Sequence, residues 1–306
     1  MKRVFTIVLL CYCAYLRSAY ADSCGASGIA LQVLGSGGPE VQGKRASSSY
    51  LIWQDGKARV LVDSGGGSPL RFGESGADFV DLDVMLFTHL HADHSAGFPS
   101  LIKSAYFQDR RRPLPVFGPP GNTAFPATTA FVKAMFDEKQ GAFRYLSDYI
   151  NPKAQSSYKI QAHDVALKAD EARMIFSNER LRVTAMQVIH GGIPAVAYRV
   201  DVAGKSVVFS GDTGGENGNL EKLAKGADLF VAHNAVLEGT TGFILKLHMP
   251  PSVIGRIAAT AGVKQLVLSH RMLRTLGHEA ETQAAIGASY HGPVAFADDL
   301  SCFPIH

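Results

Sequence analysis

Short apolar runs, separated by glycines and polar residues, recur along the chain. They are rich in the β-branched and aromatic side chains that favour strands. The clearest runs are residues 28–38, 83–89, 184–190, 228–235 and 264–270. Two longer segments, 49–67 and 194–213, contain paired runs that predict hairpins. In the first of them, Asp55-Gly56 is a dipeptide that strongly favours a two-residue turn.

Two segments predict helices, residues 95–107 and residues 250–263. The second has proline at its start, where the missing N–H costs nothing. Strands and helices therefore mix in two similar halves, about 28–180 and 181–300, which indicates an α/β chain. The stretch 120–180 is polar and aromatic with weak periodicity, and the sequence leaves open whether it forms a lid or an insertion.

Composition indicates a globular protein. An apolar fraction of 46% in 306 residues can form a core, unlike the composition of a disordered chain. No apolar run reaches the length of about 18 residues that a transmembrane helix needs, so we expect no membrane partner.

The N-terminus has the pattern of a secretory signal. Residues 2–3 are basic, residues 4–15 are apolar but too short to span a bilayer, and residues 19–21 carry small side chains at the cleavage positions. We expect residues 1–21 to be removed and residues 22–306 to form a single periplasmic or secreted domain. The alternative is a buried N-terminal helix.

Export would change the charge of the protein. The whole chain has 30 basic and 27 acidic residues, but three basic residues lie in the predicted signal, so the mature chain would be near neutral. A neutral protein has no broad field to attract nucleic acid, and the basic run 110–112 is interpreted as a solvated loop. We therefore expect no nucleic-acid partner.

The cysteines agree with export. Cys11 and Cys13 lie in the predicted signal, which leaves Cys24 and Cys302 near the two ends of the mature chain. In an oxidising compartment two such cysteines can form a bridge. We predict a Cys24–Cys302 disulfide that joins the termini. Two free buried thiols, or lipidation of Cys24, are the alternatives.

Histidine is concentrated in one stretch. Three of the 11 histidines lie with an aspartate in THLHADH, residues 88–94. His190, Asp212, His233 and His270 each follow an apolar run closely. Side chains at the ends of neighbouring strands converge on one edge of a sheet, where loops on a rigid scaffold form sites. We therefore expect these side chains to gather.

The gathered side chains have the chemistry of metal ligands. Imidazole nitrogen and carboxylate oxygen bind Zn²⁺ and its first-row neighbours. Two ions about 3.5–4 Å apart can share one hydroxide and stabilise both the attacking and the leaving oxygen. The candidate ligands are His89, His91, Asp93, His94, His190, Asp212 and His270. No cysteine lies near them in the sequence, which excludes a thiolate zinc finger.

These motifs, in this order, resemble the metallo-β-lactamase superfamily. THLHADH is followed by His190, by SGDT at 210–213 and by His270 in LVLSH. The segments 34–52 (LGSGGPEVQGKRASSSYLI) and 248–270 (HMPPSVIGRIAATAGVKQLVLSH) are similar to the branch of tRNase Z and the zinc-dependent arylsulfatases. The resemblance implies a four-layer αββα sandwich with the site at the edge where two sheets meet.

The resemblance also implies a role for each ligand. It assigns His89, His91 and His190 to one metal, Asp93, His94 and His270 to a second, and Asp212 to both as a bridge. The ions would be two Zn²⁺, with Mn²⁺ or Fe as alternatives, and the shared hydroxide would be the nucleophile. Asp63 matches an aspartate that orients a ligating histidine.

Asp93 and His248 are the predicted catalytic residues. The resemblance implies that His248 stabilises the transition state or protonates the leaving group, as an imidazolium can near neutral pH. Helix capping is the alternative for His248. tRNase Z has His-Glu where this chain has His233-Asn234. Asparagine cannot be a general acid or base, so this departure argues against tRNA processing, and the role of His233 stays open.

We therefore expect an exported, arylsulfatase-like hydrolase of small sulfate or phosphate esters. Both esters have tetrahedral anionic centres that two metals and His248 could stabilise. The expected partner is a small-molecule ester, and a homodimer is compatible with the sequence. Three alternatives stay open: a β-lactamase or lactonase acting on a cyclic carbonyl, a tRNase Z-like nuclease, and a non-catalytic metal-binding protein.

Overall fold

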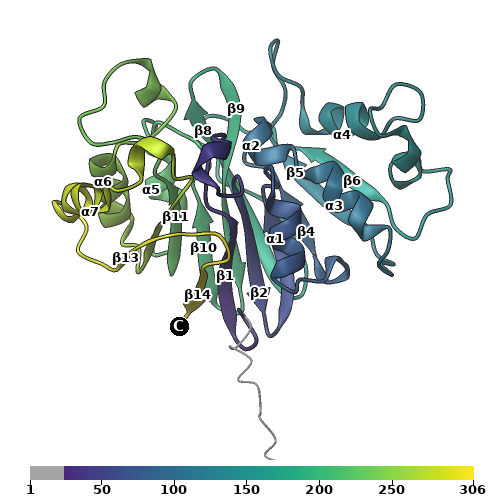
Figure 1. The fold of residues 1–306 in the computed structure, drawn as a ribbon, viewed down its shortest axis with the longest axis horizontal. Helices are drawn as coiled ribbons and strands as arrows, with labels where there is room; N and C mark the ends of the chain where they lie inside the picture. The colour runs from purple at the N-terminus through teal and green to yellow at the C-terminus, as the bar shows by residue number, and fades with distance from the viewer. Residues whose placement is uncertain (1–23) are drawn as a thin grey trace, which may run out of the picture.

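The computed structural model describes residues 24–306, so the predicted signal, residues 1–21, lies outside the described residues. The fold contains two seven-stranded sheets that face each other (Figure 1). The first has the order β14-β1-β2-β3-β4-β5-β6, and the second has the order β13-β12-β11-β10-β9-β8-β7. Among the described residues, no helix is both long enough and apolar enough to cross a membrane.

The elements of the first half build the first sheet and its outer layer. Its strands are β1 (Ile29–Gly35), β2 (Ser49–Gln54), β3 (Lys57–Val62), β4 (Val84–Leu86), β5 (Leu114–Gly118), β6 (Ile160–Asp164) and, from the C-terminus, β14 (Cys302–Ile305). The helices are α1 (Ser68–Glu74), α2 (Ala92–Ser95), α3 (Phe98–Ala105) and α4 (Thr128–Phe136), with the 3-10 helices η1 (Val41–Gly43), η2 (Phe79–Asp81) and η3 (Arg144–Tyr149).

The second half builds the second sheet in the same way. Its strands are β7 (Arg173–Ser177), β8 (Leu181–His190), β9 (Ile193–Val202), β10 (Lys205–Phe209), β11 (Leu229–His233), β12 (Leu266–Ser269) and β13 (Val294–Phe296). The helices are α5 (Asn219–Leu223), α6 (Pro251–Ala261) and α7 (Glu279–Gly287), with the 3-10 helices η4 (Phe243–Lys246) and η5 (Leu273–Thr275).

Three apolar clusters separate four layers. One cluster joins the first sheet to α1, α3 and α4, the second fills the space between the sheets, and the third joins the second sheet to α5, α6 and α7 (Figure 1). Strand β2 shows how one strand contributes side chains to two of these apolar clusters. Tyr50 and Ile52 point into the space between the sheets, whereas Leu51 and Trp53 point toward the helices. Successive side chains of a strand alternate between faces, so both faces must be apolar. The αββα prediction is confirmed.

The sharpest local predictions are also confirmed. Asp55 and Gly56 join β2 to β3 with φ of 49° and 75°, the left-handed conformation that a two-residue hairpin turn requires. Both predicted helices are present, as α3 and α6. Pro251 starts α6, and Gly262 ends it in the left-handed conformation with φ of 64°.

The segment 120–180 forms no separate lid. Phe131, Phe136 and Tyr158 are buried in the outer core of the first sheet, and β6 extends that sheet. The division between the halves also differs from the predicted one, because β7 already belongs to the second sheet.

The C-terminal strand crosses back to the first sheet. β14 pairs antiparallel with β1, and in this pairing Cys302 lies opposite Gln32. Cys302 is bonded to Cys24, at a separation of 278 residues. The structure therefore contains the predicted disulfide, and with it a covalent link between the two ends of the described chain.

The basic run at 110–112 is not the solvated loop that its composition suggests. Arg110 is fully buried and donates hydrogen bonds to the carbonyl oxygens of Leu82 (2.8 Å) and Pro113 (2.6 Å). Arg112 pairs with the buried carboxylate of Asp83. Only Arg111 of the run is strongly exposed. Carbonyl groups at element ends need donors, and these guanidinium groups supply them.

Candidate metal centre

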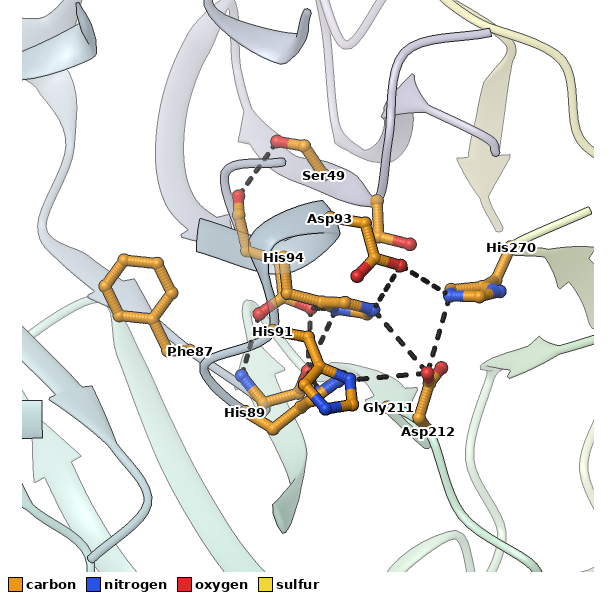
Figure 2. Close-up of polar contacts among 12 residues, drawn as sticks. Ser49, Phe87, His89, His91, Asp93, His94, Gly211, Asp212 and His270 are labelled. Atoms are coloured by element: carbon orange, nitrogen blue, oxygen red, sulfur yellow. Dashed lines mark hydrogen bonds and ion pairs between the residues drawn. The ribbon is translucent and has the colours of Figure 1, made fainter. Parts of the chain in front are cut away.

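The predicted site residues meet at one edge of the two sheets (Figure 2). His190 and His233 are the last residues of β8 and β11, and His270 directly follows β12. Asp212 lies shortly after β10, which runs parallel to β11. His89, His91, Asp93 and His94 follow β4, where a short turn leads into α2, and His248 lies just before α6. Their convergence, expected from their positions after strands, is confirmed.

Asp212 lies at the centre of the group. Its Oδ2 atom is 3.4–3.9 Å from five imidazole nitrogens, those of His89, His94, His190, His248 and His270. Most of these distances exceed that of a hydrogen bond, yet the groups are buried and aimed at one carboxylate. This spacing is what a carboxylate that shares cations with surrounding imidazoles would have.

The unpaired nitrogens of the site fit a divalent cation. The Nε2 atoms of His89, His94 and His190 are buried and have no hydrogen-bond partner among the described residues. A buried polar atom without a partner is costly, and a metal ion would satisfy it. The other ring nitrogens of two of these histidines are occupied, His94 Nδ1 by Asp63 at 2.8 Å and His190 Nδ1 by the carbonyl of Leu247 at 2.9 Å. These contacts fix the tautomer and leave Nε2 free to bind.

The candidate ligand atoms form two groups, and within each group all the atoms lie within 4.8 Å of one another. The first is His89, His91, His190 and Asp212, which corresponds to the predicted first metal with its bridge. The second is His94, Asp212, His233 and His270, which includes His233 where the sequence prediction has Asp93. Asp93 nevertheless belongs to the site, because its Oδ2 atom is 3.2 Å from His270 Nε2 and 3.6 Å from His94 Nε2.

His233 has neither ring nitrogen free. Its Nδ1 is 2.6 Å from Asp212 Oδ1, and its Nε2 is 3.0 Å from the hydroxyl of Tyr50. Burial lowers the pKa of His233 to about 4, so the ring is neutral at neutral pH. Because an ionised carboxylate only accepts, Nδ1 donates to Asp212, and the unprotonated Nε2 lies against the Tyr50 hydroxyl. His233 therefore orients the carboxylate, and Asp93 is the better candidate ligand.

Tyr50 carries no mark of a site residue in the sequence. It stands in an apolar strand, where a tyrosine is normally a core residue, and its ring does pack against Phe209 with centroids 5.5 Å apart. Only the structure shows that its hydroxyl also lies 3.0 Å from Ser269 Oγ, next to His270.

Asp63 has the position expected of an orienting residue. It follows β3 with φ of 56° and is completely buried. Its carboxylate accepts hydrogen bonds from the backbone N–H and the hydroxyl of Thr88, at 2.7 and 2.8 Å, in addition to the contact with His94. These bonds fix the start of the THLHADH turn relative to β3.

The electrostatics of the site favour an ionised Asp212. Burial raises the pKa of Asp212, but the imidazoles of His270 and His94 and the hydrogen bond from His233 outweigh it and hold the pKa well below its usual value. For His94, burial lowers the pKa, and the carboxylates of Asp63 and Asp212 outweigh this effect and raise it to about 9. A cation binding at His94 Nε2 would therefore displace a proton.

His248 differs from the expected imidazolium. Its ring is largely buried just before the N-terminal end of α6, and its Nδ1 atom lies 3.9 Å from Asp212 Oδ2. Burial lowers its pKa to about 3, and the neighbouring imidazoles of His270 and His190 act in the same direction. The carboxylate of Asp212 raises the pKa of His248 but does not outweigh burial, so the resting side chain is neutral and a further anion beside the ring would favour its protonated form.

Comparison with known proteins agrees with this fold. Residues 58–271 match the family described as the β-lactamase superfamily domain. A ribonuclease Z of Mycobacterium sp. (strain KMS) is 28% identical over 291 residues, covering 91% of this chain and 96% of that protein. A ribonuclease Z of Mycobacterium avium (strain 104) is 27% identical over 285 residues, covering 89% of this chain and 96% of that protein.

Solved structures show the same fold at lower identity. The short form of human tRNase Z superposes with a TM-score of 0.69 at 20% identity, over 90% of this chain and 99% of that one. The metallo-β-lactamase fold protein YhfI from Bacillus subtilis has a TM-score of 0.66 at 20% identity, over 90% of this chain and all of that one.

These relatives contradict two expectations. The arylsulfatase-like function and the absence of a nucleic-acid partner both conflict with full-length relatives that are named ribonuclease Z. Both expectations depended on the predicted export, on the net charge of the mature chain and on Asn234. Net charge describes the whole molecule and not the field at one edge, and a single asparagine weighs little against similarity over most of the chain. The family match over residues 58–271 and the αββα fold show that the chain belongs to the metallo-β-lactamase superfamily, as a metal-dependent hydrolase.

Proposed function

We propose that the protein is a divalent-metal-dependent ribonuclease that hydrolyses phosphodiester bonds, with tRNA as the substrate class. The observation that carries this proposal is the position of Asp212 Oδ2 within 3.9 Å of five imidazole nitrogens. Such a centre suits attack on a phosphate. The names of the relatives supply the substrate class.

We assign two cations, with zinc as the first choice, to this centre. The ligands would be His89, His91 and His190 for one ion, Asp93, His94 and His270 for the other, and Asp212 for both. When bound, such ions activate water at neutral pH and neutralise charge on the phosphate. Zinc suits a site of imidazoles and carboxylates without thiolates.

The residues around the ligands keep the centre in one geometry. Asp63 holds His94, the Leu247 carbonyl holds His190, and His233 holds Asp212. Each contact keeps the ligating atom of its partner aimed inward. Preorganised groups of this kind lower the barrier because they need no rearrangement during the reaction.

His248 would move the proton to the leaving oxygen. Its Nδ1 atom is buried, has no hydrogen-bond partner among the described residues, and lies at the same carboxylate as the ligands. A bound phosphate beside this ring favours its protonated form. Asn234 does not supply a carboxylate partner, so His248 would act without the glutamate that tRNase Z has.

We also propose that the chain is exported, with residues 1–21 as its signal. The Cys24–Cys302 disulfide supports this, because disulfides persist in oxidising compartments. Mass spectrometry of the protein from cell fractions tests it: a periplasmic or secreted chain that begins at residue 22 is expected. A full-length cytoplasmic chain would contradict export and leave the ribonuclease proposal intact.

The ribonuclease proposal is tested with the purified mature chain. The substrates are a tRNA transcript with extra nucleotides at both ends, an unstructured RNA oligonucleotide and a chromogenic β-lactam, each with Zn²⁺ and after chelation. We expect chelator-sensitive cleavage of RNA, and no cleavage by His91→Ala, which removes a ligand. Hydrolysis of the lactam alone, or no hydrolysis by protein with two metals bound, would reject the proposal.

A further inference from the structure

We propose that Phe125 and Phe243 form an aromatic clamp that stacks on the nucleobases on either side of the scissile phosphate. This inference rests on the proposed ribonuclease function. Neither ring belongs to the group of candidate metal ligands. Both lie on loops that border the site, and both loops are attached to the same turn, Gly191-Gly192, between β8 and β9.

Phe125 borders the site on the side of His91. The centroids of the two rings are 6.1 Å apart. The loop that carries Phe125 is fixed by Asn122, whose side-chain oxygen accepts hydrogen bonds from the backbone N–H groups of Ala124 and Phe125, both at 2.8 Å. The backbone N–H of Asn122 donates to the Phe125 carbonyl at 2.9 Å. The backbone that carries the ring is therefore held in a closed turn.

Phe243 borders the site on the side of His190. It begins η4 and its side chain is 67% exposed. The last residue of η4 is Lys246, whose carbonyl accepts a hydrogen bond from Gly191 at 2.8 Å, and the next carbonyl, of Leu247, accepts one from His190. A Cβ atom at Gly191 would lie 3.5 Å from Cζ of Phe243. The ring is thus in contact distance of the turn that ends β8.

The Gly191-Gly192 turn connects the two loops, and it carries no side chain. Asn122 Nδ2 donates to the Gly192 carbonyl at 2.9 Å, while Gly191 binds the other loop. Gly191 has φ of 57°, which favours glycine, and nothing lies within 4 Å of the position of a Cβ at Gly192. Phe125 lies beside His91, Phe243 lies beside the Gly191 that follows His190, and the rings of His91 and His190 have centroids 5.2 Å apart.

The chemistry of this rim fits a single-stranded nucleic acid. Phe243 is exposed and Phe125 is half-buried, and a phenylalanine with an accessible face on a fixed loop offers a surface on which any base can stack. Lys246, on the same 3-10 helix as Phe243, is exposed, and no carboxylate within residues 24–306 lies within 4 Å of its ammonium group. Aromatic rings beside an unpaired cation are the combination that holds bases and backbone together. A chain passing over the metal centre would place one base against each ring.

Phe125→Leu and Phe243→Leu test the clamp, because leucine keeps apolar bulk and removes the aromatic face. Phe107→Leu is the matched control. Phe107 is 76% exposed and follows α3, outside the rim. Two RNA substrates are compared, an RNA that the wild type cleaves and a copy with abasic sites on both sides of the scissile phosphate. Bound metal and thermal midpoint are measured for every variant.

We expect the wild type to prefer the intact RNA by about 10- to 100-fold in kcat/KM, and each clamp variant to lose about 5- to 50-fold on intact RNA but little on the abasic copy. The signal of 2-aminopurine beside the scissile bond should be quenched by wild type and by Phe107→Leu, and less by the clamp variants. An equal abasic penalty in wild type and clamp variants would reject the clamp while leaving the ribonuclease function standing. A wild type that cleaves no RNA, so that such a substrate cannot be found, would reject both.

Discussion

At the scale of single residues, the geometry separates side chains that can bind a cation from those that only orient a ligand. His233 and His94 are both buried histidines within the same group. His94 has one nitrogen occupied and one free, whereas both nitrogens of His233 have partners. The hydrogen-bond partners of the ring nitrogens, and not proximity alone, therefore separate His94 as a candidate ligand from His233 as an orienting residue.

Tyr50→Phe should weaken metal binding without unfolding the protein. The change removes the hydroxyl that faces His233 Nε2, so the ring that holds Asp212 loses one of its two anchors. Loss of such an outer contact weakens metal affinity by about 10- to 100-fold. Titration against a competing chelator measures it. Tyr158→Phe is the control, because Tyr158 is equally buried but its hydroxyl has no partner among the described residues. Equal affinities in both variants would show that the Tyr50 contact does not hold the site.

His248→Ala should slow the reaction and leave the metal content unchanged. The structure places this ring beside Asp212, and its Nδ1 is unpaired like the free nitrogens of the candidate ligands, so the metal content of the variant distinguishes a general acid from a ligand. A general acid contributes about 10²- to 10⁴-fold, so kcat on RNA should fall by that factor. Elemental analysis of the purified variant gives the metal content. Loss of a metal ion in the variant would make His248 a ligand instead.

At this scale the sequence is informative wherever chemistry restricts the residue type. Ligands must be histidine or a carboxylate, so their positions after apolar runs are recognisable in the sequence alone. Tyr50 and Ser269 act through hydroxyls in strands where a core residue is expected, and nothing in a sequence marks such a contact. The orientation of Asp212 by His233 belongs to the same category, because it depends on distances between β10 and β11.

At the scale of elements, the ends of the strands carry both the site and the contacts that join the sheets. Asp83 directly precedes β4, and its carboxylate pairs with Arg112 before β5 and with Arg180 before β8. Arg180 donates two hydrogen bonds, at 2.9 and 3.0 Å. Because β4 and β8 belong to different sheets, this buried carboxylate connects the two halves of the sandwich.

Asp83→Asn should lower the free energy of unfolding at neutral pH by about 2–3 kcal/mol, less than for a fully buried pair, because both arginines are partly exposed. Burial raises the pKa of Asp83, but the hydrogen bonds from Arg180 and Arg112 outweigh it and lower the pKa overall. A lowered folded pKa gives stability that is present above the unfolded pKa of about 4 and is lost as pH falls through the folded value.

Urea unfolding at pH 7 and at pH 3 measures both effects. The difference between wild type and Asp83→Asn should shrink at the lower pH. Asp109→Asn serves as the control, because its partner Arg111 and the carboxylate itself are about three-quarters exposed, and little change is expected. A difference that is the same at both pH values would show that the charge of Asp83 is not what joins the sheets.

Elements with strong local signals are predictable, and short ones are not. The β2–β3 hairpin and α6 carry turn and cap residues in the sequence itself. Strand β5 (LPVFG) contains proline, β13 has three residues, and α5 has five, so their patterns are too short for a period to show. The packing of α4 on the first sheet makes 120–180 part of a layer, which weak periodicity could not indicate.

At the scale of the whole molecule, the two halves are not closed units. The C-terminal strand β14 leaves the second half and becomes the outer strand of the first sheet, beside β1 (Figure 1). The four-layer arrangement followed from family resemblance. The pairing of β14 with the first sheet could not be predicted, because the sequence of a four-residue strand does not indicate which strand it pairs with. The disulfide was predictable only because the cysteines are few and lie near the ends.

Replacing Cys24 and Cys302 together by serine should lower the free energy of unfolding by about 3–5 kcal/mol. The bridge closes a loop of 278 residues, so most of its effect is a restriction of the unfolded chain. It also anchors β14 to the residues that precede β1, so the variant should exchange the backbone hydrogens of β14 faster than those of β2 and β3.

Denaturant unfolding and hydrogen exchange measure the two effects, with wild type under reducing conditions as a second comparison. Bound metal should stay at the wild-type level, because the ligands lie at the strand ends near α2 and not beside the disulfide. If instead the variant loses metal while its unfolding is unchanged, the bridge acts on the site and not on the closure of the first sheet.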